Sequence, residues 1–187
     1  YRGHPATEIA LQFAPLVFVR PGELRQAEWS EFDLNGAEWR IPAHKMKMRE
    51  MHIVPLAQQA VELLRELDPI TNRQRYVFSC LRGGDRPMSE AALTSALRRM
   101  GYTGDQMTWH GFRTIASTSL NELGFNPDII ELQLAHAERN SVRAAYNRAQ
   151  RLAERRKMMQ EWANHLDHLR IEAVAAGRQT VVSSRSL

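Results

Sequence analysis

Six polar residues, far apart along the chain, could together act on a phosphate group. Arginine side chains can neutralise the non-bridging oxygens of a phosphodiester as negative charge builds in the transition state. A tyrosine hydroxyl is a competent nucleophile once it loses its proton, and a lysine can protonate the leaving oxygen. Together these groups predict phosphodiester transfer without a metal ion. The residues are Arg20, Lys47, His110, Arg113, His136 and Tyr146.

Each of these residues also has a structural interpretation when it is taken alone. His110 and Arg113 lie three positions apart, so on a helix they share one face, as do many surface pairs. Arg20 follows the apolar run PLVFV and could form a structural ion pair with Glu23. For the others the structural interpretations are a solvated turn charge for Lys47, a helix cap for His136 and half-buried packing for Tyr146.

The elements that must position these residues are mainly helical. Asn35-Gly36 is a strong turn signal between short β-like runs. The fold class is therefore predicted as mainly α with a small three-stranded antiparallel sheet, in which a basic loop joins the last two strands. Strands are expected near Glu31–Leu34, Glu38–Pro42 and His52–Pro55. Helices are expected over residues 5–19, 22–28, 57–67, 89–100, 110–123 and 126–135, from Ser141, and over 152–169.

Composition limits the class of protein. The 187 residues are 43% hydrophobic and 25% charged, which is typical of a globular domain able to bury a core without disulfides or metals. Cys80 is the single cysteine, which excludes an intrachain disulfide and fits a reducing cytoplasm. No apolar run approaches the roughly 18 residues of a membrane span. The net charge of +4 permits a polyanionic partner, and no carboxylate triplet indicates a magnesium site.

The order and context of the six residues resemble those of the tyrosine recombinases, specifically the phage-type and genomic-island integrases. In this family the lysine lies eight residues before the proline of a VPL strand. Pro55 lies eight positions after Lys47, which favours Lys47 over Lys45. Phe18-Val19 departs from the small residue and glycine usual before the first arginine. The matching segments are VRPGELRQAEW at Arg20, HKMKMREMHIVPL at Lys47, HGFR at His110 and Arg113, LQLAH at His136, and AAYNR at Tyr146.

The resemblance implies a tyrosine recombinase catalytic-domain fold, of the DNA breaking–rejoining type, over residues 1–170. Residues 171–187 are expected to form a flexible tail, and the N-terminal DNA-binding domains of the family have no counterpart here. The implied partner is double-stranded DNA at attachment sites, with a homo-tetramer on DNA and a monomer without it. The protein is expected in the cytoplasm, away from membranes, with no cofactor and no metal.

The implied function is site-specific recombination that integrates or excises a prophage or genomic island. Tyr146 would attack a DNA phosphodiester, form a 3′-phosphotyrosyl bond and release a 5′-hydroxyl. The other roles carried over are phosphate binding by Arg20 and Arg113, proton acceptance or hydrogen bonding by His110, hydrogen bonding to the phosphate by His136, protonation of the leaving oxygen by Lys47, and orientation of Arg20 by Glu23.

Three alternatives stay open at this point. A type IB topoisomerase uses the same nucleophile to relax supercoils, a catalytically silent module would only bind DNA, and an all-α scaffold would do neither. A further ambiguity concerns an apolar stripe on the last long helix, which could pack on its own core or on a neighbouring protomer. That stripe consists of Leu152, Met158, Met159, Trp162 and Leu166.

Overall fold

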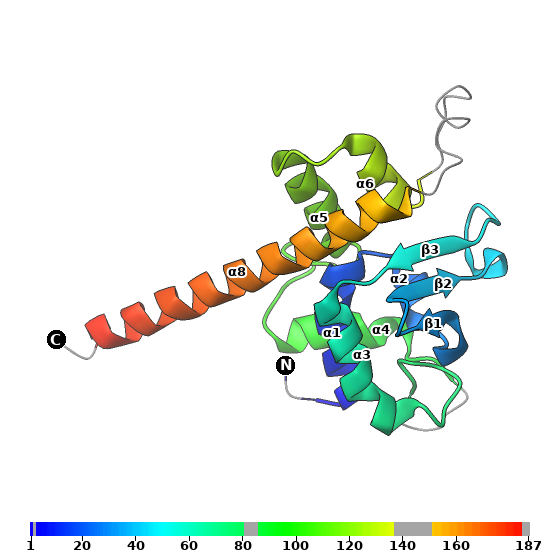
Figure 1. The fold of residues 1–187 in the computed structure, drawn as a ribbon. Helices are drawn as coiled ribbons and strands as arrows, with labels where there is room; N and C mark the ends of the chain where they lie inside the picture. Colours follow the sequence, from blue (N-terminus) through cyan, green and yellow to red (C-terminus); the bar gives the residue numbers. More distant parts are fainter. Residues whose placement is uncertain (2, 81–85, 137–150, 185–187) are drawn as a thin grey trace.

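In the computed structural model of the chain, which describes residues 1, 3–80, 86–136 and 151–184, one small sheet lies at the side of a group of helices (Figure 1). The strands are β1 (Phe32–Asp33), β2 (Glu38–Ile41) and β3 (His52–Pro55). The α-helices are α1 (Pro5–Val17), α2 (Pro21–Arg25), α3 (Gln58–Thr71), α4 (Glu90–Arg99), α5 (Gly111–Glu122), α6 (Pro127–Gln133) and α8 (Leu152–Ser184).

The three strands form an antiparallel sheet in the order β1-β2-β3, which confirms the predicted fold class. Trp39 pairs with Val54 and Ile41 with His52, so the β2–β3 loop comprises residues 42–51. Trp39 and Ile41 are buried whereas Arg40 between them is exposed, as the alternation of side chains along a strand requires. This register fixes the two points where the loop leaves the sheet.

Helix α1 is the centre of the core and contacts α3, α4, α5 and α8. Its Phe13 is fully buried, and its ring lies 5.7 Å from that of Phe78 and 6.3 Å from that of Trp39. Phe18 ends the helix with a left-handed φ of 36°. The chain therefore changes direction at Phe18 and leads through the buried Val19 to the start of α2.

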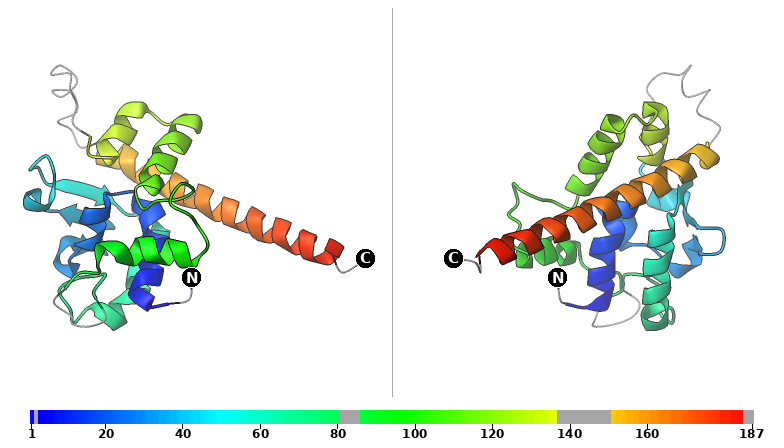
Figure 2. Two further views of the ribbon diagram at one scale, coloured as in Figure 1. Left: turned by 180° about the vertical axis from the view of Figure 1, so that it is seen from behind. Right: turned by 60° about the vertical axis from the view of Figure 1, so that its left-hand side comes forward.

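Helix α8 packs on its own chain. Met158, Met159 and Trp162 are at most 2% exposed, and the Trp162 indole donates to the carbonyl of Pro15 at 2.8 Å. These three residues of the apolar stripe are therefore covered in cis. The expected helix end at Leu169 is wrong, because α8 continues to Ser184 and extends away from the body of the molecule (Figure 2). The flexibility expected of residues 171–187 stays a prediction.

Other sequence predictions agree closely with the observed elements. Asn126 caps α6 by accepting a hydrogen bond from the Asp128 backbone at 2.9 Å, and Pro127 occupies the first turn. Gly124 has a φ of 80° just after α5, in the left-handed region that glycine adopts readily at the end of a helix. The helix expected from Ser141 and the candidate nucleophile Tyr146 lie outside the described residues. Among the helices that are described, none is long and apolar enough to cross a membrane.

Candidate active site

Arg20 lies at the junction between α1 and α2, where a reciprocal cap fixes it. Its backbone N–H donates to Glu23 Oε2 at 2.8 Å, and its Nη1 donates to Glu23 Oε1 at the same distance. Glu23 is 6% exposed, so its carboxylate is held rigidly. Pro21 starts the helix with its φ already set for the first turn. The sequence RPGE thus builds a local clamp that orients the guanidinium group.

Arg113 reaches the same place from the first turn of α5 and is only 4% exposed. Its Nη1 donates to the carbonyl of Phe18 at 2.8 Å, and its Nη2 donates to the carbonyl of Leu134 at 2.8 Å. Burial and, to a smaller extent, the nearby charge of Arg20 lower the pKa of Arg113 to about 10, although Glu23 and Glu131 act in the opposite direction. The side chain remains a cation at neutral pH.

The two guanidinium groups converge on the turn that follows α6. Arg113 donates to Leu134, and Arg20 Nη2 donates to the next carbonyl, that of Ala135, at 3.1 Å. Ala135 has a φ of 49°, in the left-handed region, which redirects the chain after the helix. Two cations held side by side by neutral carbonyls form an arrangement suited to an anion with several oxygens.

His136 completes this group and is oriented from both sides. Its Nε2 lies 3.2 Å from Arg113 Nη2, and its Nδ1 lies 2.7 Å from Glu131 Oε2. Because a guanidinium only donates, Nε2 accepts in this contact and the ring proton lies on Nδ1, facing the carboxylate. Glu131 was missed from the sequence. An acidic residue on the helix that precedes a candidate histidine is the signal that could have found it.

Lys47 and His110 are exposed, and among the described residues no side-chain hydrogen bond joins either one to the arginine pair. Lys47 lies in the β2–β3 loop, and His110 lies directly before α5, three residues from Arg113. The structure therefore brings together Arg20, Glu23, Arg113 and His136. Tyr146 falls outside the residues that the structure describes.

The other lysine of the loop, Lys45, is buried, which the sequence did not predict. Its side chain is 8% exposed, and its ammonium contacts Glu28, Glu31 and the backbone carbonyl of Gln26. Hydrogen bonds from Arg75 and Lys45 lower the pKa of Glu28 to about 2. This ionic cluster joins the β2–β3 loop to residues 26–31.

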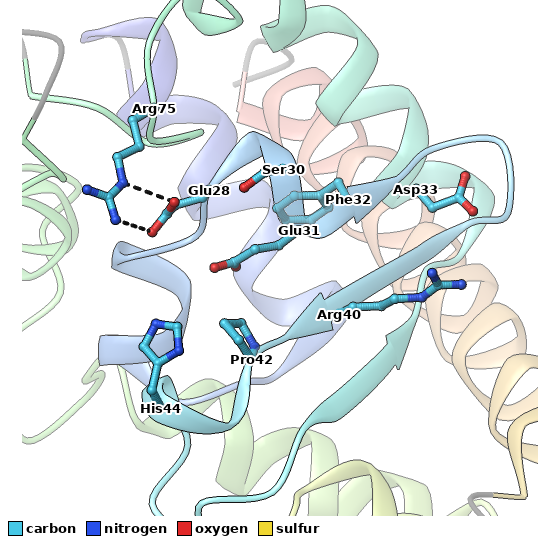
Figure 3. A pocket seen from close by; sticks show the side chains of 9 residues that line it. All are labelled: Glu28, Ser30, Glu31, Phe32, Asp33, Arg40, Pro42, His44 and Arg75. Atoms are coloured by element: carbon cyan, nitrogen blue, oxygen red, sulfur yellow. Dashed lines mark hydrogen bonds and ion pairs between the residues drawn. The ribbon is translucent and has the colours of Figure 1, made fainter.

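A pocket of about 390 Å³ includes Glu28 and Glu31 of this cluster in its lining (Figure 3). It is lined by both signs of charge, and the Arg75 guanidinium spans the Glu28 carboxylate at its edge. No residue of the arginine pair lines it. The residues that do so are Glu28, Ser30, Glu31, Phe32, Asp33, Arg40, Pro42, His44 and Arg75.

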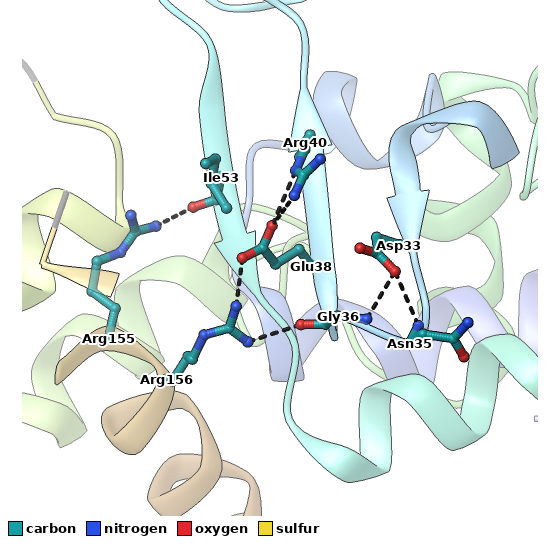
Figure 4. Close-up of polar contacts among 8 residues, drawn as sticks. All are labelled: Asp33, Asn35, Gly36, Glu38, Arg40, Ile53, Arg155 and Arg156. Carbon is teal, nitrogen blue, oxygen red and sulfur yellow. Dashed lines mark hydrogen bonds and ion pairs between the residues drawn. The ribbon is translucent and has the colours of Figure 1, made fainter. Parts of the chain in front are cut away.

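A buried polar layer under the site joins α6, α8 and β3. Arg155 is 2% exposed and donates to the Gln133 side chain at 2.8 and 3.0 Å and to the carbonyl of Ile53 (Figure 4). The imidazole Nε2 of His52 lies 3.2 Å from the Gln133 carbonyl. Burial lowers the pKa of His52 to about 3, with smaller effects from the charges of Arg155 and Arg113. His52 is therefore neutral at physiological pH.

A second anchor ties α8 to the β1–β2 turn (Figure 4). Arg156 donates to the carbonyl of Gly36 at 2.9 Å and pairs with Glu38, whose other oxygen accepts from Arg40. The Asp33 side chain closes the turn by accepting from the Asn35 and Gly36 backbones. Helix α8 thus contacts β3 through Arg155 and the start of β2 through Arg156.

Comparison of the chain with known proteins gives one family. The model of the phage integrase family matches residues 5–152. An integrase of Enterobacteria phage P4 is 46% identical over 182 residues, which cover 89% of this chain and 42% of that protein. The prophage integrase IntA of Escherichia coli K12 is 42% identical over 159 residues, covering 85% of this chain and 38% of that protein. The chain thus spans less than half of the length of these relatives.

Solved structures agree on the fold. The integrase from mycobacterium phage Brujita matches with a TM-score of 0.64 at 19% identity, covering 86% of this chain and 52% of that one. A lambda integrase tetramer bound to a Holliday junction matches with a TM-score of 0.54 at 18% identity, covering 78% and 43% of the two chains. At this level of identity the likeness concerns the arrangement of helices and strands.

Proposed function

The chain belongs to the phage integrase family, and we propose that it cuts and rejoins DNA as the catalytic domain of a site-specific tyrosine recombinase. The observation that carries this proposal is the convergence of Arg20 and Arg113 on consecutive carbonyls beside His136. Two fixed guanidinium groups can bind the non-bridging oxygens of one phosphodiester, and the imidazole can add a hydrogen bond to them when its Nε2 also carries a proton. The activity serves to integrate or excise a prophage or genomic island.

The reaction begins with attack by the Tyr146 hydroxyl oxygen on the phosphorus of a DNA phosphodiester. A 3′-phosphotyrosyl bond forms as the bond from phosphorus to the 5′-oxygen breaks. His110 takes the phenol proton, and Lys47 gives a proton to the leaving 5′-oxygen, so that a 5′-hydroxyl is released. The covalent bond conserves the energy of the phosphodiester. A 5′-hydroxyl from another strand can therefore reverse the step without ATP.

The arginine pair supplies the electrostatic part of catalysis. Charge grows on the non-bridging oxygens as the phosphorus becomes five-coordinate, and preorganised cations stabilise that charge without moving. Glu23 holds Arg20 by two hydrogen bonds, and Glu131 orients the His136 ring so that Nε2 faces the site. The two carboxylates act through the residues that they hold, because a carboxylate and a phosphate are both anions and repel each other.

The partner that we propose is double-stranded DNA at attachment sites, with four copies of the protein assembled on it and a monomer in its absence. The net charge of +4 and the DNA-bound lambda integrase with the same fold support this partner. Most of the binding energy should come from phosphate contacts and should therefore fall steeply with salt. DNA as substrate and a single cysteine suit the reducing cytoplasm as the place of action.

The test is a cleavage assay on a nicked half-site. After cleavage the short cut strand diffuses away, so religation cannot occur and the covalent adduct accumulates. The unaltered chain should form a protein–DNA adduct, and Tyr146→Phe should form none while DNA binding stays nearly unchanged. The matched control is Tyr102→Phe, at an exposed tyrosine before α5, which should cleave normally. Adducts that persist in Tyr146→Phe would show that another group is the nucleophile.

A second assay separates this proposal from the topoisomerase alternative. A recombinase given two attachment sites joins strands from different sites, and its products have exchanged flanks. A type IB topoisomerase relaxes supercoiled DNA and returns each strand to its own partner. Relaxation without exchange, under conditions where adducts form, would favour the topoisomerase.

A further inference from the structure

The loop between β2 and β3 carries two lysines with opposite environments. Lys45 is 8% exposed and lies at the end of a short 3₁₀ helix, Ala43–Lys45, whereas Lys47 is exposed. Met46 between them is 4% exposed and inserts into the core. The chain is therefore fixed directly before Lys47 and emerges into solvent at that residue.

The Lys45 ammonium is fully engaged by acceptors. An ammonium group has three N–H donors and no acceptor. Its nitrogen lies 2.7 Å from the carbonyl of Gln26, 2.8 Å from Glu28 Oε1, and in contact with Glu31 Oε1. Three donors meet three acceptors, so this lysine is built to hold its neighbours and not to pass a proton to a substrate.

These acceptors connect the loop to the element that positions Arg20. Gln26 is the C-terminal cap of α2, and Arg20 is the N-terminal cap of the same helix. The other oxygen of Glu31 accepts from the fully buried indole of Trp39 at 2.9 Å. Lys45 therefore ties the loop both to the helix of the arginine site and to the core strand β2.

The other end of the loop is anchored next to the arginine pair. His52, the first residue of β3, is 9% exposed and lies 3.2 Å from the carbonyl of Gln133, one residue before the turn that receives both arginines. Between the buried Met46 and His52 the five residues 47–51 are all exposed. Lys47 is thus the first residue of a short exposed segment with two fixed ends.

We propose that Lys45 is a positioning residue that holds Lys47 at the leaving 5′-oxygen of the scissile phosphodiester. The inference rests on the proposed function, in which Lys47 is the proton donor. Without the contacts of Lys45, the exposed segment would lose the polar anchor nearest to Lys47, and the Lys47 ammonium would sample many positions. A displacement of about 1 Å of a reacting group can lower a rate by about 100-fold, so the effect should be large.

The experiment compares two DNA substrates that differ in one bridging atom. In the first substrate the leaving group is the ordinary 5′-oxygen, which needs a proton. In the second it is a 5′-sulfur, which leaves as a thiolate without a proton because thiols are far more acidic than alcohols. We expect Lys45→Met to slow cleavage of the oxygen substrate by about 10-fold to 100-fold and of the sulfur substrate by less than about twofold. Lys47→Ala should show the same pattern.

Two further variants sharpen the comparison. Lys157→Met removes a lysine of α8 whose side chain is 78% exposed, and it should leave both rates unchanged. In a Lys47→Ala background, adding Lys45→Met should cause no further loss on the oxygen substrate, because a residue that acts through another has no effect once the other is gone. Multiplied losses in the double variant would contradict the inference.

Equal losses on both substrates would show that Lys45 only stabilises the fold and would overturn the inference. If Lys45→Met does not fold at the assay temperature, Glu31→Gln provides the same comparison, because it weakens the ion pair while keeping the shape of the side chain. A selective loss on the oxygen substrate is again expected, and equal losses again overturn the inference. If the unaltered chain forms no adduct on either substrate, the proposed function itself fails.

Discussion

Arg20 and Arg113 lie side by side because they donate to the consecutive carbonyls of Ala135 and Leu134, at 3.1 and 2.8 Å. The two arginines are 93 positions apart in the sequence, and Arg20 is the N-terminal cap of α2 whereas Arg113 lies in the first turn of α5. The turn after α6 is therefore the element that sets their separation. Any change in this turn should alter both cations at once.

Replacing either arginine should strongly reduce DNA cleavage. Arg20→Ala removes a preorganised donor, and the loss of one such donor costs about 3–4 kcal/mol, or about 100-fold to 1,000-fold in rate. Single-turnover cleavage of a nicked half-site measures this effect. Arg99→Ala, at an exposed arginine ending α4, is the matched control and should cleave normally. A loss below tenfold for Arg20→Ala would count against phosphate binding by this pair.

Weakening the contact between Glu131 and His136 should slow DNA cleavage, and removing it should slow cleavage more. Glu131→Gln keeps an acceptor for the Nδ1 proton, whereas Glu131→Ala removes it. Since a hydrogen bond to a charged group contributes about 1.5–3 kcal/mol, we expect a loss of about tenfold or more for alanine and a smaller loss for glutamine. Single-turnover rates measure both. Identical rates for the two variants and the unaltered chain would exclude an orienting role.

The buried neutral His52 should make the fold sensitive to acid. Its pKa is about 3 in the folded chain and 6.5 in the unfolded chain, so the unfolded state binds more protons between these values. The free energy of unfolding should therefore fall as the pH drops from 6.5 toward 3, with a contribution of up to about 1.4 kcal/mol per pH unit. Urea unfolding at several pH values measures this slope.

The variant His52→Gln should reduce that slope, because glutamine does not titrate. The matched control is His168→Gln, an exposed histidine of α8, which should keep the slope of the unaltered chain. A slope that is the same for all three proteins would contradict the assignment of the acid sensitivity to His52.

Arg155 should be a stability residue of α8. Arg155→Met removes hydrogen bonds to the buried Gln133 side chain and to the carbonyl of Ile53, and leaves both acceptors without this donor. We expect a loss of about 2–4 kcal/mol in the free energy of unfolding. Arg170→Met, at a side chain that is 74% exposed, should change it by less than about 0.5 kcal/mol. Equal effects of the two variants on the free energy of unfolding would contradict a stabilising role for the buried hydrogen bonds of Arg155.

Local signals account for the part of the fold that the sequence predicts correctly. The Asn35-Gly36 turn and the start of the helix expected over 126–135 depend on residues close in sequence, and both are observed where expected. The same holds for the contact of Arg20 with Glu23, which spans three positions. Because short-range hydrogen bonds form these features, they can be predicted from the sequence alone.

Features that depend on distant contacts were not predictable in this way. The burial of Lys45 depends on Glu28 and Glu31, and that of Arg155 on Gln133, which lie 14 to 22 positions away. Charged side chains at such positions look like surface residues in a sequence. The length of α8 was also misjudged, because the small and polar residues after Leu169 gave no sign that the helix continues.

The central claim is that the chain forms a covalent bond to DNA through one tyrosine, and mapping that bond by mass spectrometry tests it most directly. An adduct trapped on a nicked half-site would be digested with protease and nuclease, and the modified peptide sequenced. The account predicts a nucleotide joined through its 3′-phosphate to Tyr146, within the segment AAYNR. A bond to any other side chain, or to the 5′-phosphate, would contradict it.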